Sequence, residues 1–168
     1  MERLLTQLER VNLLIGRSVS WLTLLMVLVT FAIVVLRRLD LGWIWLQESV
    51  TFMHAAVFML GAAYTLAKEE HVRVDVFYRG ASLRRRALID AMGALLFILP
   101  VTTFLCWQSL DYVSAAWEIR EGSRDAGGLA YPAVPLVKSL IPLTAVLLGI
   151  QGIVMFLRNV MLLMRTRS

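Results

Sequence analysis

Residues 18–36 read SVSWLTLLMVLVTFAIVVL and contain no charged side chain. This length approaches the roughly 20 apolar residues with which an α-helix crosses about 30 Å of hydrocarbon. Three further uncharged stretches of similar length, each bounded by charges, lie at 49–67, 91–110 and 139–157. Every backbone polar group in lipid must be satisfied internally, and none of the stretches alternates like a strand. The sequence therefore predicts four transmembrane helices.

The composition also indicates a membrane protein. Hydrophobic residues make up 59% of the chain, charged residues make up only 17%, and the mean hydropathy is +0.72. We therefore expect an all-α integral membrane protein with one membrane domain over residues 1–168. Its four spans are expected at about 18–36, 46–67, 88–110 and 136–157.

The segment before the first span, residues 1–17, is amphipathic. Leu4, Leu8, Val11 and Ile15 recur at helical spacing among charged residues. This pattern is typical of a helix that lies in the membrane interface with its apolar face on lipid. The sequence thus predicts an N-terminal interfacial helix, with membrane lipid as one partner.

The distribution of basic residues predicts the orientation of the chain. Twelve Lys and Arg residues lie in the N-terminal segment, the connection 68–90 and the C-terminal tail, whereas five lie on the opposite side. Because cytoplasmic segments carry the excess of basic residues, we expect both termini in the cytoplasm. This asymmetry accounts for the net charge of +5, so the charge does not indicate a nucleic-acid partner.

The longer of the two connections on the other side, residues 111–138, combines aromatic and acidic side chains. They include Trp117, Glu118, Glu121 and Asp125. Because binding residues are often carried on connecting segments, we expect these four to contact a partner outside the membrane.

The patterns of common enzyme and cofactor sites are absent from the sequence. There is no G-x-S-x-G, H-E-x-x-H or phosphate-binding-loop motif, a single cysteine, Cys106, and a single histidine within a span, His54. A haem between helices needs two axial ligands, and a metal site needs clustered ligands. We therefore expect no catalytic residue, substrate site, metal or cofactor, and we predict that the chain is not an enzyme.

Two ionisable residues lie at the start of the second span. Glu48 opens the span, and His54 lies about 9 Å deeper at 1.5 Å per residue. One interpretation is a proton or ion path, since ionisable groups within membranes are often functional. The favoured interpretation is structural. Glu48 then pairs with Arg37 or Arg38 across the hairpin, and His54 hydrogen-bonds a neighbouring helix.

The most specific pattern runs from the first outer connection to the cytoplasmic end of the second span. It consists of Arg37, Trp45, Glu48, Gly61, His71 and Asp75, the last two within the string HVRVD. This pattern resembles the small membrane subunit of tripartite ATP-independent periplasmic (TRAP) transporters. That family shows an Arg, a Trp followed by acidic residues, a mid-helix Gly and a terminal His-hydrophobic-x-Val-Asp. The intervals from Glu48 to Asp75 match without a gap, although Gln47 stands where the family often has a second acid.

The resemblance implies a non-catalytic component of a three-part importer in the bacterial inner membrane. In that family a periplasmic binding protein captures a small organic acid, a large multi-span subunit moves it with a sodium gradient, and the small subunit braces the large one. The six pattern residues are then candidates for subunit contacts or structural roles. If the second helix continues past the membrane, His71 and Asp75 lie one turn apart and are expected to dock against the large subunit.

A second function class stays open, namely a self-contained oligomeric channel or proton-coupled exporter. Such a protein needs a carboxylate deep within the bundle, and none of the four uncharged stretches contains one. The sequence therefore favours the accessory subunit.

Overall fold

The computed structural model describes residues 2–68 and 80–165. Within these ranges the chain is helical and has no strand, and four of its helices are long and apolar enough to cross a membrane. The helices are α1 (Glu2–Arg38), α2 (Ile44–Ala67), a third helix composed of α4 (Leu83–Gly93), η1 (Ala94–Ile98) and α5 (Leu99–Glu118), and α6 (Ala133–Arg165). The predicted all-α architecture with four spans is confirmed.

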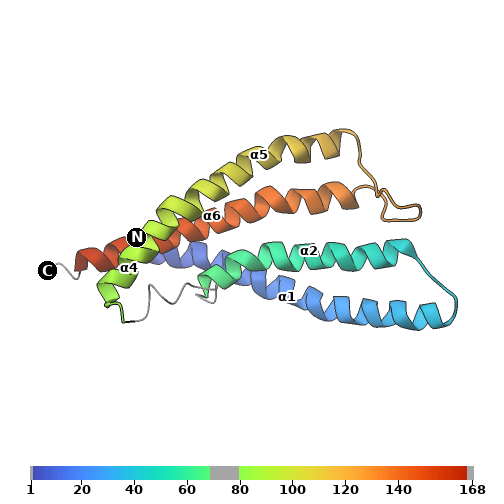
Figure 1. The fold of residues 1–168 in the computed structure, drawn as a ribbon, viewed down its shortest axis with the longest axis horizontal. Helices are drawn as coiled ribbons and strands as arrows, with labels where there is room; N and C mark the ends of the chain where they lie inside the picture. Colours follow the sequence, from blue (N-terminus) through green and yellow to red (C-terminus); the bar gives the residue numbers. More distant parts are fainter. Residues whose placement is uncertain (1, 69–79, 166–168) are drawn as a thin grey trace.

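The helices form two antiparallel hairpins, α1 with α2 and α5 with α6 (Figure 1). The central element is α6, because it contacts α1, α2, α4 and α5. Both chain termini lie toward one end of the bundle, here called the terminal end, and the α1–α2 and α5–α6 connections lie at the other, the connection end (Figure 1). This arrangement agrees with termini on one side of the membrane, and the identity of that side stays a prediction.

The first helix is longer than a membrane span requires. Its 37 residues extend over about 55 Å at 1.5 Å per residue. Residues 2–17, which the sequence predicts as a separate interfacial helix, form the first turns of α1 itself. The apolar face of this segment is partly uncovered, since Leu4 is 64% and Val11 48% exposed whereas Leu8 and Ile15 are half-buried. Contact between that face and lipid therefore stays a prediction, whereas the boundary at residue 17 is absent.

Opposite charges align where the first half of α1 packs on the end of α6. Glu9 accepts two hydrogen bonds from the Arg158 guanidinium, at 2.8 and 2.7 Å. Glu2 accepts one from Arg165 at 2.6 Å. The two acids are seven residues apart, as are the two arginines, and this is the repeat with which helices pack along one another at a small angle.

A buried amide continues this seam toward the middle of the bundle. Asn12 is 1% exposed, and its Nδ2 donates to Gln151 Oε1 at 3.1 Å and to the Leu147 carbonyl oxygen at 3.3 Å. One turn further, a Cβ added to Gly16 would lie 2.3 Å from Tyr64 Cβ. Glycine at this position thus lets α2 approach α1 closely, and α1 continues through it without a break.

The third helix contains a wider turn near its middle, and Figure 1 shows the helix curving over α6. In the π-helical segment η1, the Leu99 N–H donates to the Ala94 carbonyl oxygen, five residues earlier. Pro100 follows directly in the first turn of α5. Proline lacks an N–H and its ring crowds the carbonyl four residues earlier, so the wider turn relieves both conflicts.

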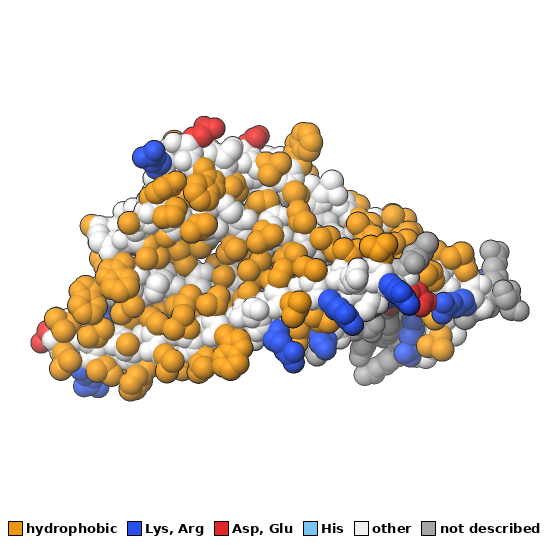
Figure 2. All heavy atoms as spheres, turned by 180° about the vertical axis from the view of Figure 1, so that it is seen from behind, with side chains coloured by type: hydrophobic (Ala, Val, Ile, Leu, Met, Phe, Trp, Pro, Cys, Tyr) orange, Lys and Arg blue, Asp and Glu red, His pale blue; other side chains and the backbone are white. Residues whose placement is uncertain are grey.

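Small side chains fill the interior, and large apolar side chains face outward. Ala63, Ala91 and Ala94 are 1%, 5% and 0% exposed, whereas Trp107 is 78% and Phe58 75% exposed. Figure 2 shows hydrophobic side chains along the length of one face, with most of its Lys and Arg toward one end. Close helix contacts through small residues and an apolar exterior are typical of bundles in lipid.

Candidate subunit interface

Glu48 fastens the α5–α6 connection to the beginning of α2. One oxygen of its carboxylate accepts a hydrogen bond from the Ser123 hydroxyl at 2.7 Å, and the other accepts from the Leu129 backbone N–H. The backbone N–H of Trp45 also donates to the Gly127 carbonyl oxygen at 3.0 Å. Hydrogen bonds to an ionised acceptor are about twice as strong as neutral ones. Glu48 therefore joins the two hairpins at the connection end.

Two glycines allow this attachment. Gly127 has a φ of +80°, in the left-handed region that glycine adopts without steric cost. A Cβ added to Gly128 would lie 2.3 Å from Ser123 Oγ and 2.7 Å from Glu48 Oε2. A larger residue at position 128 would consequently push the carboxylate off its partners.

The pairing of Glu48 with Arg37 or Arg38 that the sequence predicts is not formed. Arg37 Nη2 instead donates to Gln47 Oε1 at 3.3 Å, so the glutamine spans the α1–α2 hairpin. Consecutive residues point about 100° apart around a helix. This rotation turns the Glu48 carboxylate away from α1 and toward the α5–α6 connection.

Of the four residues predicted to contact a partner protein at the connection end, two already have partners within the chain. Glu121 forms an ion pair with Lys138, and the Trp117 indole N–H donates to a hydroxyl of α6 at 3.0 Å. The ion pair holds the connection on α6, and the indole hydrogen bond holds the end of α5 on α6. Glu118 and Asp125 are exposed, and their carboxylates form no hydrogen bond with other described residues. Contact of these two acids with a partner stays a prediction.

A groove follows the contact between α1 and α2 at the depth of the predicted spans. It consists of two cavities of about 650 and 480 Å³, both lined by Thr23. The larger cavity is lined by Phe58 and Gly61 among others, and the smaller one by His54. A Cβ added to Gly61 would meet no atom within 4 Å, so the missing side chain contributes to the opening.

Polar side chains line this groove where lipid offers no hydrogen-bond partner. They include Thr23, Thr30, Thr51 and His54, all of them exposed, and the exposed Arg17 and Ser20 also line the larger cavity. The sequence predicts that His54 bonds a neighbouring helix, but its imidazole forms no hydrogen bond with the described residues. An unpaired polar group costs free energy in hydrocarbon, and hydroxyls with small residues are typical of helix contacts in membranes. The groove therefore suits a further transmembrane helix.

In the structure, the described residues of the predicted pattern lie at two places. Arg37, Trp45 and Glu48 come together at the connection end, and Gly61 lies in the α1–α2 groove. The string that contains His71 and Asp75 lies outside the described residues. Among the residues that the structure describes, no group of three His, Cys, Asp or Glu side chains could hold a metal ion.

A family model for the DctQ component of tripartite ATP-independent periplasmic transporters matches residues 26–161. The chain belongs to this family. The match includes the α2 side of the α1–α2 groove and the α5–α6 connection, and it leaves out residues 2–25 of α1, among them Gly16 and Thr23 of the larger cavity. This DctQ-type chain is thus a multi-pass membrane subunit of a TRAP transporter. No curated protein and no solved structure matches it significantly.

Reasoning from the sequence missed two contacts of the DctQ-type chain. The seam between α1 and α6 had a signal, because Glu2 and Glu9 repeat at the same interval as Arg158 and Arg165. The attachment of Glu48 had none in the local sequence, since its Leu129 partner lies 81 positions away.

Replacing Glu48 by Gln is expected to loosen the α5–α6 connection. The amide keeps one acceptor oxygen, but its NH₂ group accepts no hydrogen bond, and bonds to charged groups contribute about 1.5–3 kcal/mol. Hydrogen exchange at the Leu129 amide of the purified chain should therefore accelerate by roughly tenfold or more. Glu118→Gln removes an exposed carboxylate nearby and is the control. Unchanged exchange at Leu129 in Glu48→Gln would contradict the attachment.

Proposed function

We propose that this DctQ-type chain braces a large multi-span transport subunit that imports a small organic acid with a sodium gradient. A periplasmic binding protein delivers the acid, and the assembly lies in the bacterial inner membrane. The family description supports the tripartite organisation. A brace needs helices with an outward contact surface, and it does not need a polar cavity for substrate.

The α1–α2 groove is the observation that carries this proposal. It combines an exposed imidazole, three threonine hydroxyls and the opening at Gly61 at membrane depth. A helix of the large subunit in this groove would offer a hydrogen-bond partner to His54 and would cover Phe58. Lipid chains would cover Phe58 and leave the imidazole unpaired.

The attached connection between α5 and α6 is the surface we assign to the periplasmic binding protein. Glu48 holds this connection in one arrangement while Glu118 and Asp125 remain exposed. A surface that is ordered before binding loses less conformational entropy when a partner docks. Because Arg120 and Arg124 are exposed beside the two acids, this surface offers charges of both signs to the binding protein.

The placement of charge favours a brace over a carrier. The four uncharged stretches contain one histidine, His54, and no Asp, Glu, Lys or Arg. Carriers bind substrate and coupling ion near the bilayer midplane through polar groups and interrupted helices. We infer that transport itself occurs in the large subunit.

Filling the groove should separate the chain from its large subunit. Gly61→Leu adds a side chain where the chain itself has free space, so the isolated fold should persist while a partner helix is displaced. Overpacking costs about 1–3 kcal/mol, which weakens association about 5- to 150-fold. The measurement is co-purification of the large subunit with a tagged chain. Gly93→Leu is the matched control, because its Cβ also meets no atom within 4 Å but lies on the third helix. Equal yields from the two variants would rule out the groove as the contact.

The basic residues of the terminal end support an orientation with both termini in the cytoplasm. Gln7→Cys and Ala126→Cys test it in a Cys106→Ser background, because both positions are exposed and neither change alters the Lys and Arg distribution. A membrane-impermeant maleimide added to spheroplasts is expected to label position 126 and to spare position 7. Labelling at position 7 with protection at position 126 would reverse the orientation.

A further inference from the structure

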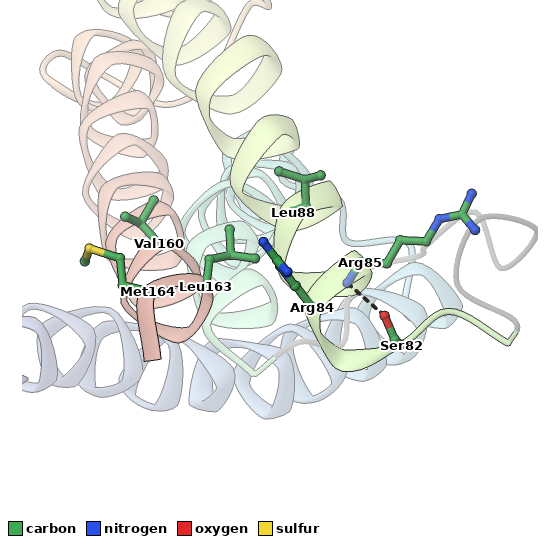
Figure 3. A pocket seen from close by; sticks show the side chains of 7 residues that line it. All are labelled: Ser82, Arg84, Arg85, Leu88, Val160, Leu163 and Met164. Atoms are coloured by element: carbon green, nitrogen blue, oxygen red, sulfur yellow. Dashed lines mark hydrogen bonds between the residues drawn. The ribbon is translucent and has the colours of Figure 1, made fainter. Parts of the chain in front are cut away.

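A cavity of about 560 Å³ opens between the start of α4 and the end of α6. Figure 3 shows the two helices side by side with the lining side chains between and around them. Apolar side chains form its floor: Leu88 of α4 with Val160, Leu163 and Met164 of α6. The cavity is open on one side, as a groove for an extended apolar chain would be.

Arg84 and Arg85 of α4 line the cavity, and none of the acidic residues that the structure describes lines it. Figure 3 shows the Arg84 side chain between α4 and α6, near Leu163, whereas Arg85 extends away from the cavity. Neither guanidinium forms a hydrogen bond or ion pair with another described residue. The Arg84 guanidinium thus presents its donors beside an apolar floor.

The acidic side chains of α1 at this end of the bundle already have partners. Glu9 binds Arg158, and Glu2 binds Arg165, the residue that follows Met164 of the cavity floor. These two carboxylates are therefore committed to the α1–α6 seam. The positive charge at the cavity favours an anionic ligand.

The cavity lies across the predicted boundary between water and hydrocarbon. Arg84 precedes the uncharged stretch 91–110 by two helical turns, and Val160 follows the stretch 139–157 by three residues. A ligand here meets the polar interface at its arginine side and the membrane interior along its floor. A phospholipid has its parts in the same order, a polar headgroup followed by apolar acyl chains.

We propose that this cavity binds an anionic phospholipid of the adjacent leaflet. The headgroup phosphate accepts hydrogen bonds from the Arg84 guanidinium, whose planar fork suits phosphate oxygens. An acyl chain lies along Leu88 and Val160 and fills the apolar part of the cavity. A free phosphate ion would use the arginine alone and leave the apolar floor exposed, so the lipid explains both parts of the cavity. This inference concerns the isolated chain and does not depend on the proposed transport partner.

The test compares lipids and variants on the purified full-length chain. Phosphatidylglycerol and phosphatidylcholine with identical acyl chains are titrated into the detergent-solubilised protein, and bound lipid is counted by native mass spectrometry. The wild-type chain is expected to retain phosphatidylglycerol in preference to phosphatidylcholine. Arg84→Gln should lower that preference about fivefold, the effect of one basic residue at a membrane surface.

Arg85→Gln is the matched control, because it removes the same charge from the neighbouring side chain that points away from the cavity. It should lower the preference less than Arg84→Gln. Val160→Trp keeps both arginines and fills the floor, and it should reduce retention of phosphatidylglycerol. Each variant is compared with the wild type by its helical circular dichroism. Equal retention of the two lipids by the wild type, or equal effects of Arg84→Gln and Arg85→Gln, would overturn the proposal.

Discussion

The antiparallel seam between the first half of α1 and the end of α6 is the polar contact that sets the register between the two hairpins. The Glu9–Arg158 ion pair is only partly buried, with side chains 16% and 42% exposed, and a pair of this kind contributes at most about 1 kcal/mol. The buried Asn12 amide constrains the helices more strongly, because moving it away from Gln151 and Leu147 would leave its NH₂ group unpaired in apolar surroundings, in addition to its already unpaired Oδ1. The charges thus align the helices, and the amide fixes their register.

This seam explains how a chain with so small an interior holds its helices in place. Alanine and glycine fill the contacts between helices, so large apolar side chains remain on the surface. At the other end of the bundle, Glu48 joins the hairpins a second time through the α5–α6 connection. Two attachments at opposite ends leave the α1–α2 groove between them open for a partner. The proposed bracing role follows from that combination of a fixed frame and an uncovered face.

The four spans could be predicted from the sequence because hydrocarbon thickness and backbone satisfaction leave few alternatives to four helices. The register of the helices could not. Leu4 and Val11 indicated an amphipathic surface helix, yet the face that packs on α6 carries Asn12 and Glu9, which periodicity of apolar residues alone would assign to water. In a membrane bundle the lipid-facing side can be the more apolar one, so the usual inference from amphipathicity is reversed.

For a similar reason, only part of the candidate site could be predicted from the sequence. Glu48 and Gly61 stood out through their place in the family pattern, but the contacts of Glu48 depend on a connection far along the chain. His54 was expected inside the bundle, and the rotation of α2 instead brings it to the groove. Spacing within one helix gives the relative direction of its side chains, and only packing decides which direction is inside.

Photocrosslinking in cells that produce the large subunit tests most directly whether the α1–α2 groove holds a helix of that subunit. Phe58 lines the groove and is 75% exposed, whereas Phe97 lies in η1 and is 69% exposed. A benzophenone amino acid replaces each phenylalanine in turn, so size and apolar character are nearly matched. We expect an adduct with the large subunit from position 58 and little or none from position 97. An adduct from position 97 alone, or from neither position, would contradict it.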